Sequence, residues 1–146
     1  MKFNIDGASK GNPGTAGYGG VLRDEQGNVL CIFHSHLGKE TNNMAELMAM
    51  EQCLDLLKQE NRQNVIVEAD SELIIDSVKR ISWGSKPEKV SKNWRLIQGL
   101  QWIQTHLQSL NTTSFKHVRR LANKMTDLLS NQGVTNTQNR IVLNWQ

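Results

Sequence analysis

The spacing of hydrophobic and polar residues changes in an orderly way along the chain. Apolar and polar positions alternate over Lys2–Ala8, and two further apolar segments follow at Gly17–Arg23 and Val29–His36. Alternation of this kind, broken by turn residues, predicts three strands. The connection at 25–28 is short enough for a hairpin, so we expect the second and third strands to be antiparallel neighbours.

Helical spacing replaces this alternation from Asn43 onward. Apolar residues recur there every three or four positions, and Thr41 and Asn42 are suitable N-caps for the helix that this spacing predicts. The apolar positions of this amphipathic helix are Met44, Leu47, Met50, Leu54 and Leu57.

Strands and helices also make up the second half of the chain. A short apolar strand at 65–67 runs directly into Asp70 and Ser71, which are suitable caps for a second helix. Ligands of open α/β sheets bind at the carboxyl ends of strands, so Asp70 stands in a functional location as well as a capping one. The spacing then predicts an irregular basic connection at 82–94, a helix at 94–107, a fifth strand at 112–118 and a last helix at 121–129 that Gly133 can stop.

The length and composition fit one globular domain. The chain has 146 residues, 38% hydrophobic and 21% charged, which is enough for one compact core and too little for two. We expect the domain to span 1–133 and the polar remainder, 134–146, to be a loosely ordered C-terminal tail. No apolar run could cross a membrane and no signal peptide is evident, so we expect a soluble, intracellular monomer, with nucleus and cytoplasm equally compatible.

Charge, cysteines and histidines narrow the function only slightly. The formal charge of +3 and the pI of about 9.0 fit a polyanionic partner if the cations cluster. Cys31 and Cys53 lie in apolar runs without metal-ligand spacing, which favours reduced core thiols over a disulfide or a zinc site. His34, His36 and His106 show no partner pattern, and we assign them to strand or helix surfaces.

Four carboxylates carry the functional interpretation, namely Asp6, Glu46, Asp70 and Asp127. A buried carboxylate in a strand, as expected for Asp6, is costly unless a metal ion or a donor meets it. If the fold gathers all four, they repel one another unless divalent cations hold them, which points to a two-metal phosphodiester site. Taken singly, Glu46 and Asp127 are equally compatible with solvated helix positions, and Asp70 with a helix cap.

Four motifs contain these carboxylates, in an order typical of one family. They are DGASKGNPGTAGYGGVLRDE, TNNMAELMA, VEADSELIIDSV and HVRRLANKMTDLLSN, which together reach to about Asn131. In these residues the chain resembles the ribonuclease H (type 1) family, and it looks most like the ribonuclease H domains of plant retroelements. The resemblance implies an α/β, ribonuclease H-like fold: a five-stranded mixed sheet in the order 3-2-1-4-5, flanked by helices on both faces.

The resemblance also implies a metal site and its ligands. Asp6 would bridge two Mg²⁺ ions, Asp127 would help to hold the ion that activates water, and Glu46 with Asp70 would hold the other. Oxygen ligands suit Mg²⁺ or Mn²⁺ and not zinc. His117 occupies the place of the family's active-site histidine, and by the same resemblance Arg120 could carry part of that role.

Contacts with nucleic acid are expected at two kinds of position. By resemblance, Gly11 and Asn12 would contact the RNA backbone, Thr41 and Asn43 the DNA strand, and Asn123 belongs to the last motif. The densest basic stretch suits backbone tracking along a duplex. It contains Lys86, Lys89, Lys92 and Arg95, interleaved with Trp83 and with Trp94, for which we prefer a core position.

The resemblance therefore implies an endoribonuclease that hydrolyses the RNA strand of RNA/DNA hybrids by a two-metal mechanism and leaves 5′-phosphate and 3′-hydroxyl ends. Selection of RNA would rest on the 2′-hydroxyl and on duplex shape. Two alternatives stay open: a catalytically silent nucleic-acid-binding remnant, and a structural module that helps a reverse transcriptase fold. The expected partners are the hybrid and a reverse transcriptase domain of the same polyprotein, as in a retrotransposon.

Overall fold

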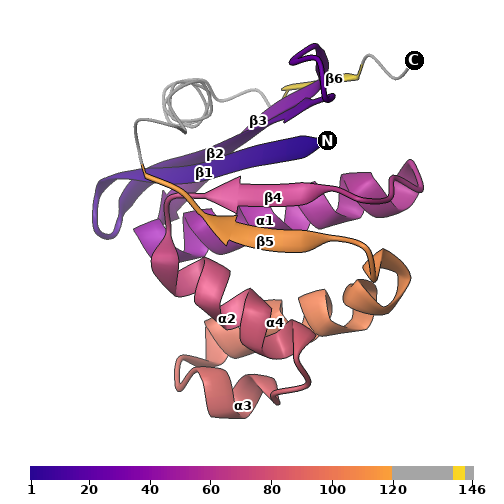
Figure 1. The fold of residues 1–146 in the computed structure, drawn as a ribbon. Coiled ribbons are helices and arrows are strands. Elements are labelled where there is room, and N and C mark those ends of the chain that lie inside the picture. Colours follow the sequence, from indigo (N-terminus) through magenta and orange to yellow (C-terminus); the bar gives the residue numbers. More distant parts are fainter. Residues whose placement is uncertain (120–139, 144–146) are drawn as a thin grey trace.

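A computed structural model describes residues 1–119 and 140–143 of the chain (Figure 1). Up to the fifth strand the elements follow the predicted order, with two additions: a short helix in the connection that we expected to be irregular, and a 3-10 turn before the fifth strand. The elements are β1 (Lys2–Gly11), β2 (Gly14–Arg23), β3 (Val29–Glu40), α1 (Asn42–Gln59), β4 (Ile66–Ala69), α2 (Glu72–Ser82), α3 (Pro87–Val90), α4 (Trp94–Leu107), the 3-10 turn η1 (Gln108–Leu110), β5 (Ser114–His117) and β6 (Arg140–Leu143).

A single mixed sheet contains the described strands in the order β5-β4-β1-β2-β3-β6. β1, β2 and β3 are antiparallel neighbours, whereas β4 pairs in parallel with β1 and β5 in parallel with β4. The predicted hairpin joins β2 to β3, closed by a hydrogen bond of 3.0 Å from Asp24 N to Asn28 O. The predicted order 3-2-1-4-5 is confirmed for the five strands to which it refers.

The strand β6 is an element that the sequence did not predict. It lies within 134–146, where we expected only a loosely ordered tail, and it pairs antiparallel with β3 from Cys31 to His34. A sheet edge offers a row of unpaired backbone groups, and a short apolar segment can satisfy them. The pairing thus depends on an edge more than 100 residues earlier in the chain, which no local pattern reveals.

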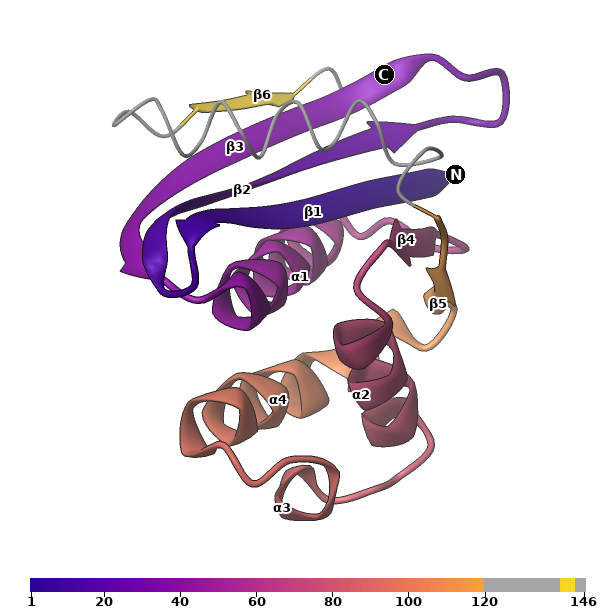
Figure 2. The same cartoon turned by 90° about the vertical axis from the view of Figure 1, so that its left-hand side faces the viewer.

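The described helices lie on one face of the sheet (Figures 1 and 2). α1 begins where predicted, because the Thr41 hydroxyl oxygen accepts a hydrogen bond of 3.2 Å from Met44 N. Its apolar side chains pack with those of the sheet and of α4 in a single hydrophobic core. The predicted helix at 121–129 lies outside the described residues. Within the described part, none of the helices has the length and apolarity to cross a membrane.

The structure corrects two assignments of side chains and confirms another. Trp94 is 65% exposed, not in the core. The buried stripe of α4 starts at Leu96, and two residues apart on a helix point in nearly opposite directions. His34, expected at the surface, is buried in β3, which β6 makes an inner strand. Cys31 and Cys53 are buried free thiols, as predicted.

Candidate active site

Three of the four predicted carboxylates meet in space. Asp6 lies on β1, Glu46 in α1 and Asp70 directly after β4, and one carboxylate oxygen of each lies within 4.8 Å of the others. Parallel pairing of β1 with β4 puts Ile5 opposite Ala69, so the next residue along each strand is an acid. Asp6 and Glu46 are only 1% and 7% exposed, and Asp70 is half-buried. We call these three residues the carboxylate cluster.

Gly7 explains how α1 comes so close to β1. A Cβ atom on Gly7 would lie 2.4 Å from both the carbonyl carbon of Ala45 and the backbone nitrogen of Glu46. Such distances do not occur between real atoms, and no rotamer change can move a backbone. The missing side chain therefore lets the backbones of β1 and α1 touch beside two members of the cluster. The sequence analysis missed this contact, because a motif does not show which backbones meet in the fold.

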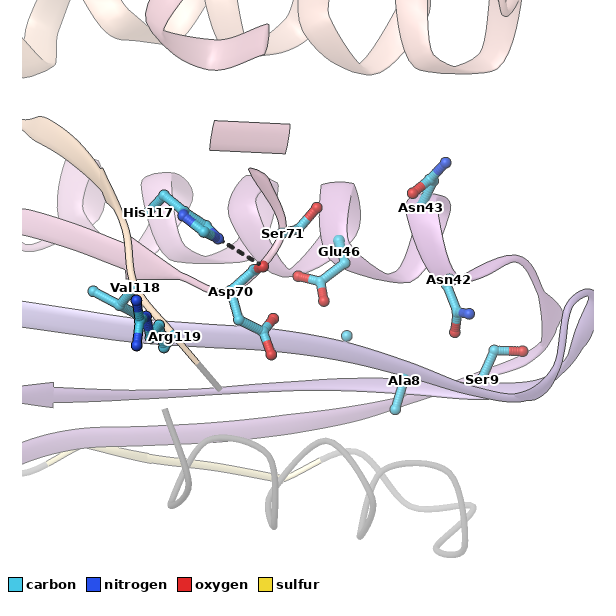
Figure 3. Close-up of a pocket in the computed structure, with 11 residues that line it drawn as sticks. Ala8, Ser9, Asn42, Asn43, Glu46, Asp70, Ser71, His117, Val118 and Arg119 are labelled. Atoms are coloured by element: carbon cyan, nitrogen blue, oxygen red, sulfur yellow. Dashed lines mark hydrogen bonds between the residues drawn. The ribbon is translucent and has the colours of Figure 1, made fainter. Parts of the chain in front are cut away.

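The local structure after β4 separates two roles that the sequence left open for Asp70. The helix cap is Ser71, whose hydroxyl oxygen accepts from Ile74 N at 3.4 Å while its carbonyl accepts from Ile75 N at 3.1 Å. Ser71 caps α2, whereas the carboxylate of Asp70 lies toward that of Glu46 in the pocket (Figure 3). The capping interpretation of Asp70 is therefore wrong.

An open pocket of about 620 Å³ adjoins the cluster (Figure 3). His117 lies on its border and is exposed, and its Nε2 atom is 3.2 Å from the carbonyl oxygen of Asp70. A carbonyl only accepts hydrogen bonds, so Nε2 carries the hydrogen in this contact. The residues that line the pocket are Gly7, Ala8, Ser9, Asn42, Asn43, Glu46, Asp70, Ser71, His117, Val118 and Arg119.

The cluster and pocket fit a hard divalent cation. Carboxylate oxygens are the ligands that Mg²⁺ and Mn²⁺ prefer, and three of them converge beside an open space that can admit water or a phosphate oxygen. The cluster contains no cysteine or histidine, the ligands typical of zinc. Asp127, the fourth predicted ligand, and Arg120 and Asn123 lie outside the described residues.

The residues expected to contact RNA and DNA lie together around the start of α1. The Asn12 side-chain oxygen accepts from Asn42 N at 3.1 Å, which joins the β1–β2 turn to the helix. Gly11 has a backbone φ angle of +93°, a positive value that glycine adopts more readily than other residues. Asn43 lines the pocket, whereas Thr41 caps the helix beside it. Ser9 and Asn42 also line the pocket, a position that the sequence analysis did not predict for either, although both stand inside the quoted motifs.

The basic stretch lies away from the pocket. Its three lysines are exposed, as are the flanking tryptophans, with Trp83 at 76%. Arg95 differs from them, because it forms two hydrogen bonds to Glu40, of 2.7 and 2.6 Å. These bonds lower the pKa of the Glu40 carboxyl. We therefore define the lysine segment as Lys86, Lys89 and Lys92 with Trp83 and Trp94, and leave Arg95 out of it.

Comparison with known proteins gives consistent matches. A family model described as reverse transcriptase-like matches residues 4–133. The ribonuclease H of Bordetella bronchiseptica is 32% identical over 142 residues, which cover 92% of this chain and 89% of that protein. A longer Arabidopsis thaliana protein, provisionally named as a ribonuclease H, is 36% identical over 131 residues. The match covers 90% of this chain and 20% of the plant protein.

A solved structure matches the fold over nearly its whole length. It is a ribonuclease H1 isolated from compost by a metagenomic approach, crystallised in complex with an RNA/DNA hybrid. The TM-score is 0.79 at 30% identity, and the match covers 92% of this chain and 96% of that one.

Proposed function

This chain belongs to the ribonuclease H enzyme family, and we propose that it hydrolyses the RNA strand of RNA/DNA hybrids with the help of divalent metal ions. The observation that carries the proposal is the carboxylate cluster, in which one oxygen of each residue lies within 4.8 Å of the others. Such groups repel one another until cations neutralise them. Cleavage is endonucleolytic and leaves a 5′-phosphate and a 3′-hydroxyl end.

The proposed ions are two Mg²⁺, with Mn²⁺ as a substitute. Asp6 would contact both ions, Glu46 and Asp70 one of them, and Asp127 the other. When bound, two such ions activate a water molecule and stabilise the leaving oxygen of an in-line displacement at phosphorus. The near-complete burial of Asp6 and Glu46 supports this assignment, because buried acids are held in one orientation by the residues packed around them.

The proposed role of His117 is to move protons at the edge of the pocket. Its Nε2 atom is 3.2 Å from Asp70 O, which orients the ring beside the cluster. An imidazole can both donate and accept a proton, so it is well suited to shuttle protons between the leaving oxygen and solvent. We assign Arg120 an accessory role beside it.

Recognition of the hybrid is proposed to use two sets of residues. Gly11 and Asn12 would contact the backbone and 2′-hydroxyls of RNA, and Thr41 and Asn43 the DNA strand, with Asn123 nearby. The lysine segment would follow the phosphates further along the duplex. This division supports selection by duplex shape and the 2′-hydroxyl, without readout of base edges.

We further propose that the chain acts beside a reverse transcriptase domain, in a retrotransposon setting. The description of the matching family model as reverse transcriptase-like supports this. So does the plant relative, of which this chain spans only 20%. The chain itself is expected to act as a monomer.

The test is cleavage of a labelled RNA strand offered in RNA/DNA hybrid, in RNA/RNA duplex and as a single strand, with a labelled DNA/DNA duplex alongside. Each reaction contains Mg²⁺, Mn²⁺ or EDTA. We expect cutting of the hybrid alone, dependent on the metal. The variants Asp6→Asn and Asp70→Asn should lose about a thousandfold or more in rate, because each removes a charge that the metal ions require.

The matched control is Asp76→Asn, which removes an exposed carboxylate of α2 outside the cluster and should cut normally. Thermal unfolding without metal should show Asp6→Asn at least as stable as wild type, because it relieves repulsion within the cluster. Binding of hybrid without cutting in any metal would contradict the proposal and favour the catalytically silent alternative.

A further inference from the structure

Glu40 and Arg95 form a two-point ion pair between elements far apart in the sequence. The Nη1 and Nη2 atoms of Arg95 donate to Oε1 and Oε2 of Glu40 at 2.7 and 2.6 Å. Glu40 is the last residue of β3, and Arg95 lies in the first turn of α4. Two parallel hydrogen bonds fix the relative orientation of two groups as well as their distance.

The environment of Glu40 is unlike that of a solvated surface pair. Its side chain is 13% exposed, against 45% for Arg95. Its Oε1 atom also accepts from Thr41 N at 3.2 Å, and its carbonyl oxygen accepts from the Ser9 hydroxyl at 2.9 Å. Glu40 thus connects β1, the start of α1 and the start of α4.

The proposed substrate contacts lie at both ends of this connection. At one end are the β1–β2 turn and the helix start, which are bound to each other through Asn12 and Asn42. At the other end the lysine segment is held to its neighbours by two hydrogen bonds. Gln101 of α4 donates to the Glu88 carboxylate at 3.1 Å, and Arg80 of α2 donates to the Lys89 carbonyl at 3.4 Å.

We propose that Glu40 and Arg95 are positioning residues that hold the lysine segment at a fixed place relative to the residues that contact the two strands of the hybrid. This inference rests on the proposed function and extends it to the grip on the duplex. A duplex that binds both regions at once must fix their relative position. If that position varies in the free protein, the entropy lost on fixing it weakens binding. The pair acts through these regions and needs no contact of its own with the substrate.

A different role for Arg95 predicts the opposite result for one variant. If Arg95 were a phosphate contact that Glu40 restrains, then Glu40→Gln would release a cation toward the duplex and tighten binding. If the pair positions the lysine segment, Glu40→Gln and Arg95→Gln both weaken binding. The sign of the Glu40→Gln effect therefore separates the two roles.

The experiment compares wild type, Glu40→Gln, Arg95→Gln and the exchanged pair Glu40→Arg with Arg95→Glu. The measurements are kcat and KM for hybrid cleavage, and Kd for hybrid in EDTA. For each single variant we expect KM and Kd to rise about three- to tenfold with kcat nearly unchanged. The exchanged pair should recover part of the loss, since it keeps the net charge and restores an ion pair at the same place, but an arginine at position 40 cannot accept the hydrogen bond from Thr41 N.

Several results would overturn the inference. Tighter binding by Glu40→Gln would make Arg95 a restrained phosphate contact. Unchanged KM and Kd in both single variants would show that the ion pair does not affect substrate binding. A wild type that binds hybrid without cutting it would contradict the proposed function while the Kd comparison still tests the pair. A wild type that does neither would refute both.

Discussion

The carboxylate cluster and the lysine segment are built in opposite ways. The cluster is assembled from β1, α1 and β4, with Asp6 and Glu46 almost fully buried and the backbones of two elements in contact beside them. The lysine segment consists of exposed side chains, and its two tryptophans are 76% and 65% exposed. The packed core thus positions the proposed catalytic residues, whereas exposed side chains form the proposed substrate-binding surface.

The two regions also differ in what they cost the fold. Gathering three carboxylates in a partly buried space opposes folding until cations bind, so packing of the surrounding elements has to offset the repulsion. Exposed lysines cost the folded state almost nothing and can be exchanged freely. Substitutions around the cluster should therefore affect catalysis and stability together, and substitutions in the lysine segment should affect substrate binding alone.

Among substitutions that leave every proposed metal ligand in place, Gly7→Ala should have the largest effect. The added methyl group would meet the backbone of Ala45 and Glu46, so α1 must move away from β1 and separate Glu46 from Asp6. We expect a loss of stability of about 1–3 kcal/mol, typical of overpacking. The rate should fall about 10- to 100-fold and more Mg²⁺ should be needed, as when ligand orientation is disturbed. Mg²⁺ titrations of the rate and thermal unfolding measure both.

Gly99→Ala is the matched control for this variant. A methyl group there would press on the same helix from α4, but it would meet the Leu47 and Glu51 side chains at 2.3 and 2.8 Å instead of backbone. This variant should lose stability without a higher Mg²⁺ requirement. Equal Mg²⁺ dependence of the two variants would mean that Gly7 acts on stability alone.

A smaller effect, confined to binding, is expected when the three lysines of the lysine segment are replaced by glutamine. KM for the hybrid should rise about tenfold at low salt while kcat and the unfolding temperature stay the same. The slope of log K against log salt should become shallower by about two to three, because fewer counterions are released. Lys58→Gln, at the far end of α1, should leave that slope unchanged. A fall in kcat would contradict the proposal that the lysine segment contributes to substrate binding and not to catalysis.

Local patterns predicted the elements that local forces decide. Alternation identified β1 to β3, and the caps Thr41 and Ser71 stand where helices begin, because a cap bonds to an amide within three residues of itself. The pairing of β6, the burial of His34 and the ion pair of Arg95 each depend on residues elsewhere in the chain, so no short window of sequence predicts them. Those positions depend on tertiary contacts, and the sequence missed them.

The candidate site divides along the same line. The resemblance of their motifs to one family identified Asp6, Glu46 and Asp70, since Glu46 and Asp70, taken singly, were equally compatible with a solvated helix position and a helix cap. The contribution of Gly7 is an absence of atoms, which becomes visible only when α1 lies against β1. Geometry is therefore needed to see which residues hold the ligands in place.

The smallest expected effect comes from Glu51→Gln, which separates Glu51 from Glu46 on the same helix. Glu51 lies outside the cluster, five residues after Glu46, and burial raises its pKa from 4.5 to about 7. Its raised pKa means that stability is lost as pH rises from about 4.5 through 7, because the folded state binds the proton more tightly. Glu51→Gln should thus stabilise the protein by about 1 kcal/mol at pH 8, allowing for its partial exposure, and change little at pH 4.5. Denaturant unfolding at both pH values measures this. Mg²⁺ should stabilise wild type and Glu51→Gln equally, because the proposed metal ions contact Glu46 and not Glu51. Unequal stabilisation by Mg²⁺ would place Glu51 in the metal site.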